Sequence, residues 1–509
     1  MNYYESGIGI EELSKHFNFK LISYTKPSKV TYLSSDSRKC DESIFFCLYD
    51  EFLTNSDIYL LNAINLKCST FLISETIFNQ LNSEIRDRLF KENIMLSDKN
   101  PSVIHGKIAS FLLDNPSEKL EIIAVTGTNG KTTITSVLFN LFIRMNLKSG
   151  LIGTINIKYG DKIIDSSYTT PDPSSLQLIL YEMLKEGIEY VFMEASSHGL
   201  KLGRINGCSI RAGIFSNLTP DHLDFHLTME DYFLSKFKLF EILNESPKKN
   251  KLSIVSVDSP GGKEMIDKIK TLNPNFLSLG FGKDELYYGF NLKLSLQGSE
   301  FKIRSLDQIF NIKSNLLGNY NYLNISLVYI LAINLYPTRK EEILRLIAGL
   351  SPVEGRFELV YSKDRTRLGI VDYAHTPDAL ENILKSMKEI PNSGIITIFG
   401  CGGDRDRKKR PIMGEIACSF SKYVIITSDN PRTEEPFSIL NEISKDLPEK
   451  FNNFELIVDR RSAIQRGVEL LSENGFLLIA GKGHENYQII GTKKLPFSDT
   501  EELKKAFQI

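Results

Sequence analysis

A short loop between an apolar segment and a helical one carries the residues of this chain best suited to chemistry. Gly127 and Gly130 let the backbone curl so that its N–H groups converge on phosphate oxygens. Lys131 would supply a positive charge to the β and γ phosphates, and the Thr132 hydroxyl can join a Mg²⁺ shell. Four residues usually separate the glycines of such loops, whereas here there are two. The loop predicts a nucleotide-phosphate site made by Gly127, Thr128, Asn129, Gly130, Lys131, Thr132 and Thr133.

Acidic and histidine side chains follow two further apolar segments. Glu194 comes directly after residues 190–193, where a nucleotide-bound Mg²⁺ needs a hard oxygen ligand. Asp221, His222, Asp224 and His226 follow residues 212–215 and form a candidate metal or proton-transfer cluster. Surface loops also carry such residues without a function, so this cluster alone leaves both interpretations open.

The elements that must position these groups can be predicted from hydrophobic periodicity. Residues 122–125 are apolar throughout, which is typical of a buried parallel strand. A helix should follow the loop, because apolar residues recur there at helical spacing: Ile134, Val137, Leu138, Leu141 and Phe142. A second helix is expected over residues 177–186, closed by Gly187. Further strands are expected at residues 44–48, 70–73, 190–193, 212–215, 369–371, 395–399, 423–427 and 476–480.

Two proline-containing polar breaks, at residues 115–118 and 351–355, divide the chain. Strands and helices alternate on both sides of each break, which indicates parallel sheets covered by helices. The sequence therefore predicts three α/β domains over residues 1–117, 118–350 and 351–509.

Composition limits the classes of function. With 509 residues the chain exceeds what one core usually supports. Its net charge of −2 argues against a general binder of nucleic acid, so anionic ligands must meet local basic residues. Six scattered cysteines fit reduced thiols, and no secretion signal is evident at the N-terminus. The longest apolar stretch, residues 325–335, is too short to span a membrane and predicts a buried helix. We expect a cytoplasmic protein without a membrane span.

Three polar clusters follow strands of the third segment. They are the glycine- and arginine-rich residues 400–411, then residues 429–432, then residues 481–485. Each cluster alone could be a solvated run of charges. Because the carboxyl ends of parallel strands meet at one sheet edge, the three together favour a ligand site.

The motifs GTNGKTT, MEASSHG and NLTPDHLDFH, in this order and spacing, resemble those of the Mur ligases. These are ATP-dependent, amide-forming enzymes of peptidoglycan synthesis. The resemblance covers essentially the whole chain and implies an α/β fold of three domains. It implies a small N-terminal domain that grips the UDP end of the substrate, a central P-loop ATPase-like domain with a parallel sheet, and a C-terminal Rossmann-like domain for the incoming amino acid.

The same resemblance assigns roles at the ligase centre. It implies Mg²⁺ held by Thr132, Glu194, His222 and Lys236, the last as a carbamate formed from CO₂. Lys131, His222 and Lys236 are then the expected catalytic residues. Judged by its position alone, Lys236 would be a solvated helix residue. Further ATP contacts are implied for Asn321, Asn324, Arg356 and Asp372, some of them beyond the break at residues 351–355, so closure of the domains should complete the ATP site.

Other motifs resemble substrate-binding segments of family members that add the third residue of the stem peptide. For the UDP-N-acetylmuramoyl-dipeptide these are Thr169, Thr170, Ser196 and Arg204, with Ser35 and Ser37 at the uridine end. Here the chain also departs from the family, since residues 49–52 replace a glycine-rich stretch and Leu202 stands where Gln is common.

Resemblance to the diaminopimelate-adding members implies an amino-acid site made by Arg405, Asp429, Asn430, Pro431, Arg432, Gly481 and Glu485. Meso-2,6-diaminopimelate carries a distal carboxylate that the Arg432 fork can pair with, whereas lysine and ornithine end in an ammonium. Diaminopimelate is therefore predicted, with L-lysine and L-ornithine as alternatives.

Two rival functions share the phosphate loop. Folylpolyglutamate synthetase uses the same ATP chemistry, but the 429–432 cluster and the N-terminal Ser35 to Arg38 segment argue against it. A P-loop regulatory ATPase would have no use for the second ligand-binding α/β unit, and no guanine-reading NKxD motif follows the loop. We expect a monomeric ligase that activates a carboxylate as an acyl phosphate.

Overall fold

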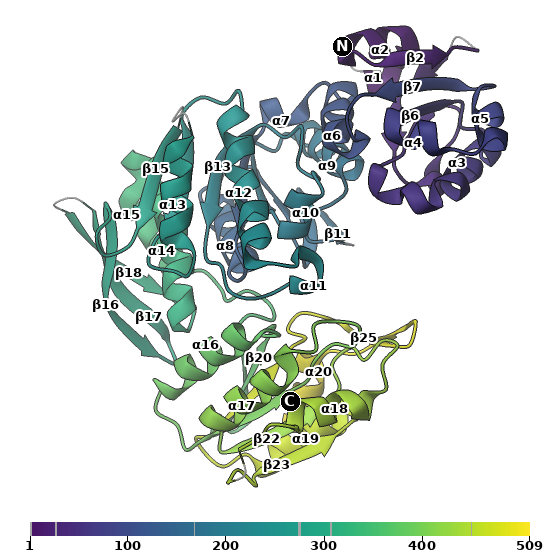
Figure 1. Ribbon diagram of the computed structural model, residues 1–509. Coiled ribbons are helices and arrows are strands. Elements are labelled where there is room, and N and C mark those ends of the chain that lie inside the picture. Colours follow the sequence, from purple (N-terminus) through teal and green to yellow (C-terminus); the bar gives the residue numbers. More distant parts are fainter. Residues whose placement is uncertain are drawn as a thin grey trace.

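The computed structural model describes residues 3–25, 28–166, 168–272, 276–305, 308–448 and 450–508. Figure 1 shows three α/β bodies following one another along the chain: N-terminal (purple), central (blue to green) and C-terminal (yellow-green). Each body is built around its own sheet. The predicted α/β class with three parts is confirmed, and the residue numbers of the two domain boundaries stay predictions.

The N-terminal body has a five-stranded sheet in the order β2-β7-β6-β5-β4, parallel except for β2. The 3-10 helix η1 (Ser37–Lys39) follows β4 directly and carries the predicted uridine-end segment. The strands are β2 (Lys20–Ser23), β4 (Tyr32–Ser34), β5 (Ile44–Cys47), β6 (Thr70–Ser74) and β7 (Asn93–Ser97), with a small pair β1 (Ile8–Gly9) and β3 (Lys29–Val30). The helices are α1 (Tyr3–Ser6), α2 (Ile10–Phe17), α3 (Ser56–Asn65), α4 (Glu75–Gln80), α5 (Ser83–Leu89) and α6 (Pro101–Leu112), with the 3-10 helix η2 (Asp50–Asn55).

The central body is an eleven-stranded sheet in the order β11-β10-β9-β12-β8-β13-β14-β15-β16-β17-β18. Its middle is parallel, as predicted, but β10, β11, β17 and β18 add antiparallel edges that the sequence pattern did not reveal. The strands are β8 (Glu121–Thr126), β9 (Ser149–Ile152), β10 (Asn156–Tyr159), β11 (Lys162–Asp165), β12 (Tyr190–Glu194), β13 (Ile210–Phe215), β14 (Lys251–Ser256), β15 (Phe276–Phe281), β16 (Tyr287–Ser295), β17 (Gly298–Ser305) and β18 (Gln308–Ser314).

Helices cover both faces of this sheet and bury separate apolar cores. On one face, α8 and α14 contribute Val137, Phe142 and Leu331, and on the other α9 and α12 contribute Leu180 and Phe240. The buried helix expected over 325–335 is α14. The helices are α7 (Pro116–Lys119), α8 (Lys131–Arg144), α9 (Pro173–Lys185), α10 (Ser197–Lys201), α11 (Leu223–His226), α12 (Met229–Glu245), α13 (Gly262–Thr271), α14 (Asn319–Leu335) and α15 (Lys340–Ala348), with the 3-10 helix η3 (Pro337–Arg339).

The C-terminal body has a six-stranded sheet in the order β19-β20-β24-β21-β22-β23, parallel except for β19. Three of its strands coincide with the expected ranges, because each is a short apolar run bounded by polar residues. The strands are β19 (Glu358–Tyr361), β20 (Leu368–Asp372), β21 (Ile395–Phe399), β22 (Tyr423–Thr427), β23 (Phe454–Ile457) and β24 (Phe476–Ala480), with a hairpin of β25 (Tyr487–Ile490) and β26 (Lys493–Pro496). The helices are α16 (Pro377–Lys388), α17 (Lys409–Phe420), α18 (Pro436–Ser444), α19 (Arg460–Leu470) and α20 (Asp499–Phe507).

The break expected at residues 115–118 is not an open linker. Asn115 adopts a left-handed conformation, and the one-turn helix α7 follows with Pro116 and Ser117 buried. The break at residues 351–355 lies between α15 and β19 and has no regular structure apart from a turn. Among the described residues we find no helix that combines the length and the apolar character needed to span a bilayer.

Candidate active site

The phosphate loop lies between β8 and α8, as predicted. Gly127 and Gly130 both have positive φ, and a Cβ on Gly130 would collide with the Asn324 side chain, so glycine is required there. The half-buried Lys131 donates from Nζ to the carbonyl oxygens of Gly127 (2.9 Å) and Thr128 (2.8 Å). These bonds hold the ammonium over the loop, where phosphate oxygens would converge.

Glu194 ends β12, the parallel neighbour of β8, so its carboxylate lies beside the start of α8. Its Oε2 accepts from the Thr132 hydroxyl (2.9 Å) and from the Thr154 hydroxyl (3.1 Å), while Oε1 accepts from the Thr154 backbone (2.8 Å). The side chain is 1% exposed. Two predicted magnesium ligands, Thr132 and Glu194, are thus in direct contact.

His222 follows β13 on the opposite side of β8 and has a left-handed backbone with φ 55°. Its Nε2 lies 3.4 Å from Asp221 Oδ2. Burial lowers the pKa of His222 to about 3, although Asp221 acts in the opposite direction. The ring is therefore neutral at pH 7, which is the form that binds metals.

Lys236 is not the solvated helix residue that its position alone suggested. The helix α12 turns it inward, where its side chain is fully buried and Nζ has no hydrogen-bond partner. The ammonium position lies 4.1 Å from the centre of the Tyr232 ring. Burial, reinforced by the positive charge of Lys131, holds the pKa of Lys236 well below its usual value. A buried amine kept neutral is a nucleophile, which is what carbamate formation requires.

The C-terminal body reaches the phosphate loop through two contacts. The Arg356 guanidinium donates to the Thr132 hydroxyl (3.2 Å), and the Asn129 side chain donates to Asp378 (2.9 Å). Arg356 also lies over the Tyr373 ring at 4.6 Å. The predicted ATP residues therefore come from both bodies.

A cavity between these bodies brings together most of the predicted ATP residues. Asn324, Arg356 and Asp372 line it, and Asn321 does not. Asn321 instead accepts a hydrogen bond from Asn324 at 3.0 Å and so orients it. The loop and helix residues lining the cavity are Asn129, Gly130, Thr133, Ser216, Asn217, Tyr320, Leu323, Asn324, Leu327, Arg356, Asp372, Tyr373, Ala374, His375, Ala379 and Asn382.

A second cavity, of about 670 Å³, is lined by residues of the same two bodies and shares Tyr373 with the first cavity. It collects predicted residues of the muramoyl-dipeptide, metal and amino-acid sites, namely Thr169, Ser196, Arg204, His222, Arg405 and Glu485. Arg204 is held there by a bond to the Thr170 carbonyl (2.9 Å) and by the Tyr168 ring 4.6 Å away. Two substrates could meet in this space.

Some predicted substrate residues do not line either cavity. Thr170 is buried and donates to the Glu194 carbonyl (2.8 Å), so it supports the strand end that carries the metal ligand. Ser35 and Ser37 lie in the N-terminal body, at the end of β4. Arg38 beside them is exposed and folds back on Asp36, with Nε 2.8 Å from Oδ1.

The predicted amino-acid cluster is one hydrogen-bonded unit at the edge of the C-terminal sheet. Asn430 donates to Glu485 (2.9 Å), and the buried Lys482 donates to Asn430 (3.1 Å) and to Glu485 (2.8 Å). Arg432, with φ 51°, pairs in a bridge with Ile490 of β25, and its guanidinium donates to the Gly403 carbonyl (2.7 Å).

The remaining members of that cluster occupy the same edge. Pro431 is buried beside Asn430, and Gly481 has φ 115° and no room for a Cβ because Asp429 lies against it. Arg405 is exposed, with its side chain bonded to the Asp404 carbonyl (3.0 Å). The structure thus brings all seven residues to one edge, as the three strand ends predicted.

Several residues of the second cavity were not predicted from the sequence. His198 lies in the MEASSHG motif and His484 in the cluster at residues 481–485, so the position of each in a recognised motif could have indicated a place in the site. Tyr487 and Lys494 lie on the β25–β26 hairpin, with Lys494 Nζ 3.7 Å from the centre of the Tyr487 ring. No spacing in the sequence marks this hairpin as part of a site.

Known protein families match most of the chain. The Mur ligase middle domain matches residues 125–332, and the domain described as "Mur ligase, glutamate ligase domain" matches residues 355–483. A UDP-N-acetylmuramoyl-L-alanyl-D-glutamate–2,6-diaminopimelate ligase of Leptospira interrogans is 47% identical over 483 residues, covering 94% of each chain. A ligase of the same name from Clostridium perfringens is 37% identical and covers 97% of this chain and 98% of the relative.

A solved structure gives the same result. A UDP-N-acetylmuramoyl-L-alanyl-D-glutamate–2,6-diaminopimelate ligase superposes with a TM-score of 0.68 at 31% identity, covering 99% of both chains. The resemblance seen in the sequence motifs is confirmed. The chain belongs to the Mur ligase family of ATP-dependent ligases.

Proposed function

We propose that this chain joins an amine of meso-2,6-diaminopimelate to the D-glutamate carboxylate of UDP-N-acetylmuramoyl-L-alanyl-D-glutamate, with conversion of ATP to ADP and phosphate. The observation that carries the proposal is the full-length similarity to ligases of that name, at 47% identity. The arrangement of the two cavities supports it, because Tyr373 lines both: the first cavity contains residues of the phosphate loop, and the second contains Arg405 and Glu485 of the amino-acid cluster. We further propose that it acts in the cytoplasm as a monomer.

The chemistry needs an activated carboxylate, since a free carboxylate is a poor electrophile. The carboxylate oxygen attacks the γ-phosphorus of ATP, the bond to ADP breaks, and an acyl phosphate forms. The neutral amine then attacks the acyl carbon, phosphate leaves, and the nitrogen releases one proton to solvent as the amide bond forms. Lys131 and Arg356 would offset the repulsion between carboxylate and triphosphate.

Thr132, Glu194 and His222 fit a magnesium site because they offer a hydroxyl, a buried carboxylate and a neutral imidazole. Within the described residues, however, no three His, Cys, Asp or Glu side chains gather closely enough to hold a metal. A carbamate on Lys236 would supply the additional carboxylate. When bound, Mg²⁺ would neutralise charge on the transferring phosphoryl group.

The carbamate itself follows from simple chemistry at Lys236. The lone pair of the neutral amine attacks CO₂, a C–N bond forms, and one proton is released, which leaves an anion on the side chain. The orphaned, fully buried Nζ supports this modification, because an unmodified amine there lacks any hydrogen-bond partner.

Selection of the amino acid would depend on ion pairs between arginine side chains and the carboxylates of the substrate. We propose that Arg432 and Arg405 pair with carboxylates of diaminopimelate, while Asp429, Asn430 and Glu485 meet its ammonium groups. Lysine and ornithine lack the distal carboxylate and would leave one guanidinium unpaired.

Ligation with diaminopimelate, L-lysine and L-ornithine side by side tests this proposal. We expect a new amide product, one ADP per product, and a clear preference for diaminopimelate. A preference for lysine or ornithine would disprove the specificity, and ATP hydrolysis indifferent to both substrates would disprove the ligase itself.

A further inference from the structure

A chain of hydrogen bonds crosses the contact between the N-terminal and central bodies. The Tyr49 hydroxyl lies 2.6 Å from Nδ1 of His105, and Nε2 of His105 contacts the Ser174 hydroxyl. Ser174 Oγ in turn donates to the Leu33 carbonyl at 2.8 Å. Tyr49, His105 and Leu33 belong to the N-terminal body, whereas Ser174 lies in the first turn of α9 in the central body.

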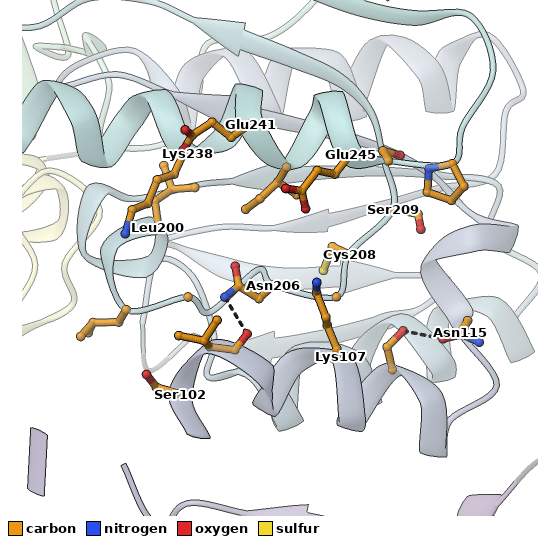
Figure 2. Close-up of a pocket in the computed structure, with 18 of the residues that line it drawn as sticks. Ser102, Lys107, Asn115, Leu200, Asn206, Cys208, Ser209, Lys238, Glu241 and Glu245 are labelled. Atoms are coloured by element: carbon orange, nitrogen blue, oxygen red, sulfur yellow. Dashed lines mark hydrogen bonds between the residues drawn. The ribbon is translucent and has the colours of Figure 1, made fainter. Parts of the chain in front are cut away.

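The packing of α6 around His105 fixes the position of this series of hydrogen bonds. His105 is fully buried on α6, which packs against β4 of the N-terminal sheet and against α9 of the central body. The next residue, Gly106, leaves no room for a Cβ because the Asn206 carbonyl lies against it. On the neighbouring face of α6, the Asn206 side chain donates to the Val103 carbonyl at 3.1 Å. Figure 2 shows Asn206 directed toward the helix that carries Ser102 and Lys107.

The direction of each bond can be assigned. Burial lowers the pKa of His105 to about 4, against a smaller opposing effect of Asp172, so the ring is neutral and carries one N–H. Ser174 gives its only hydrogen to Leu33, so it must accept from Nε2 of His105. Nδ1 is then the acceptor, and Tyr49 donates to it. Every group in the chain is satisfied without a ligand.

Two members of this hydrogen-bond series, Leu33 and Ser174, adjoin predicted substrate segments. Leu33 lies in β4, just before Ser35 and Ser37. Ser174 follows Thr169 and Thr170 closely along the chain, and Asp172 between them caps α9 by accepting from the Ser175 backbone (3.1 Å). Arg204 lies close enough to Tyr168, Asp172 and Tyr49 for their charges to affect it. Burial lowers the pKa of Arg204, and these three groups act in the opposite direction.

We propose that Tyr49, His105 and Ser174 are positioning residues that fix the distance between the uridine-end segment and the ligase centre. This inference rests on the proposed function, and it adds residues outside the predicted binding set. Since the substrate would be gripped at its uridine end and react at its D-glutamate end, an error in the angle between the bodies would misplace the reacting carboxylate. Tyr49 stands in the stretch where this chain departs from the family's glycine-rich pattern.

The test separates positioning from general stability by using two acceptors. With UDP-N-acetylmuramoyl-L-alanyl-D-glutamate, Tyr49→Phe should raise the KM of that substrate about tenfold. The reason is that His105 loses its hydrogen-bond donor, so the N-terminal body is held less rigidly against the central body. The KM values of ATP and diaminopimelate should stay unchanged. With N-acetylmuramoyl-L-alanyl-D-glutamate, which lacks the UDP anchor, wild type and variant should react equally. Tyr24→Phe, at an exposed tyrosine of the same body, is the matched control.

Ser174→Ala interrupts the same series of hydrogen bonds at a second residue. It should likewise raise the KM of the UDP-linked acceptor and leave the reaction of the acceptor without UDP unchanged. Equal losses with both acceptors in both variants would mean that the chain only stabilises the fold, and unchanged KM values would also overturn the inference. Failure of the wild-type chain to ligate either acceptor would instead overturn the proposed function on which the inference rests.

Discussion

The central body has two junctions, and they are built in opposite ways. At the N-terminal junction, α6 lies against the segment of Asn206, and the His105 chain satisfies its own hydrogen bonds in a buried place. At the C-terminal junction, the contacts join groups that also line the proposed ATP site, such as Asn129 with Asp378 and Arg356 with Thr132.

This difference assigns different tasks to the two junctions. A contact that is complete without a ligand keeps its geometry whether or not substrate is bound. A contact between groups that a ligand would engage must rearrange when the ligand arrives. We therefore expect the N-terminal junction to act as a fixed joint and the C-terminal junction to respond to ATP and amino acid.

The largest effect is expected from Lys131→Met, at the centre of the C-terminal junction. Loss of the charge that faces the phosphates should lower kcat about 10³-fold. ADP release measured with all substrates present checks this prediction. Lys107→Met, at an exposed lysine on α6, is the control and should keep wild-type activity. Loss of less than tenfold in Lys131→Met would exclude a role in phosphoryl transfer.

Lys236→Met should have the next largest effect, about 10²-fold in kcat, because the carboxylate of the carbamate is lost. Acetate should restore part of the activity by entering the same space, and removal of CO₂ should slow the wild-type enzyme. Lys238→Met, on the same helix but half-buried, is the matched control. Full activity of the Lys236 variant without acetate would contradict the carbamate.

Arg432→Ala tests the far side of the C-terminal junction. It should raise the KM of diaminopimelate about 30-fold, since a charged hydrogen-bonded pair is lost, with little change in the KM of ATP. Initial rates at varied amino-acid concentration give the answer. Arg461→Ala, which breaks the ion pair of this exposed arginine with the buried Glu502, should leave both KM values unchanged. Equal changes in both KM values would show that Arg432 holds the junction rather than the amino acid.

The smallest expected effect concerns the N-terminal junction and pH. The pKa of His105 is lowered to about 4, so the unfolded chain binds a proton that the folded chain rejects as pH falls below about 6.5. The stability from this group is therefore present above pH 6.5 and is lost as pH falls towards 4. Between pH 7 and pH 5 it should cost about 2 kcal/mol of unfolding free energy. Urea unfolding of the wild type and of His105→Gln measures the difference, and parallel pH profiles would contradict it.

The elements nearest the chemistry could be predicted from the sequence because their signals are local. The loop at Gly127 and Gly130, the helix after it and the strand before Glu194 follow from glycines and apolar periodicity. The burial of Lys236 could not be predicted from the residues alone, because it depends on how α12 is rotated against β13. The Tyr487 and Lys494 hairpin and the Tyr49 to Ser174 chain were missed for the same reason, since each depends on contacts between distant segments.

Before any ligand binds, the Lys131 ammonium already donates hydrogen bonds to the carbonyls of Gly127 and Thr128. A ligand that reaches this ammonium must replace two neutral oxygens, so only the difference between old and new bonds contributes to affinity. A neutral acceptor on an inhibitor would gain almost nothing by this exchange, whereas an anion would gain the charge interaction as well. The loop therefore selects ligands by charge. An uncharged mimic of the triphosphate should bind mainly through contacts in the cavity lined by Asn324 and Asp372.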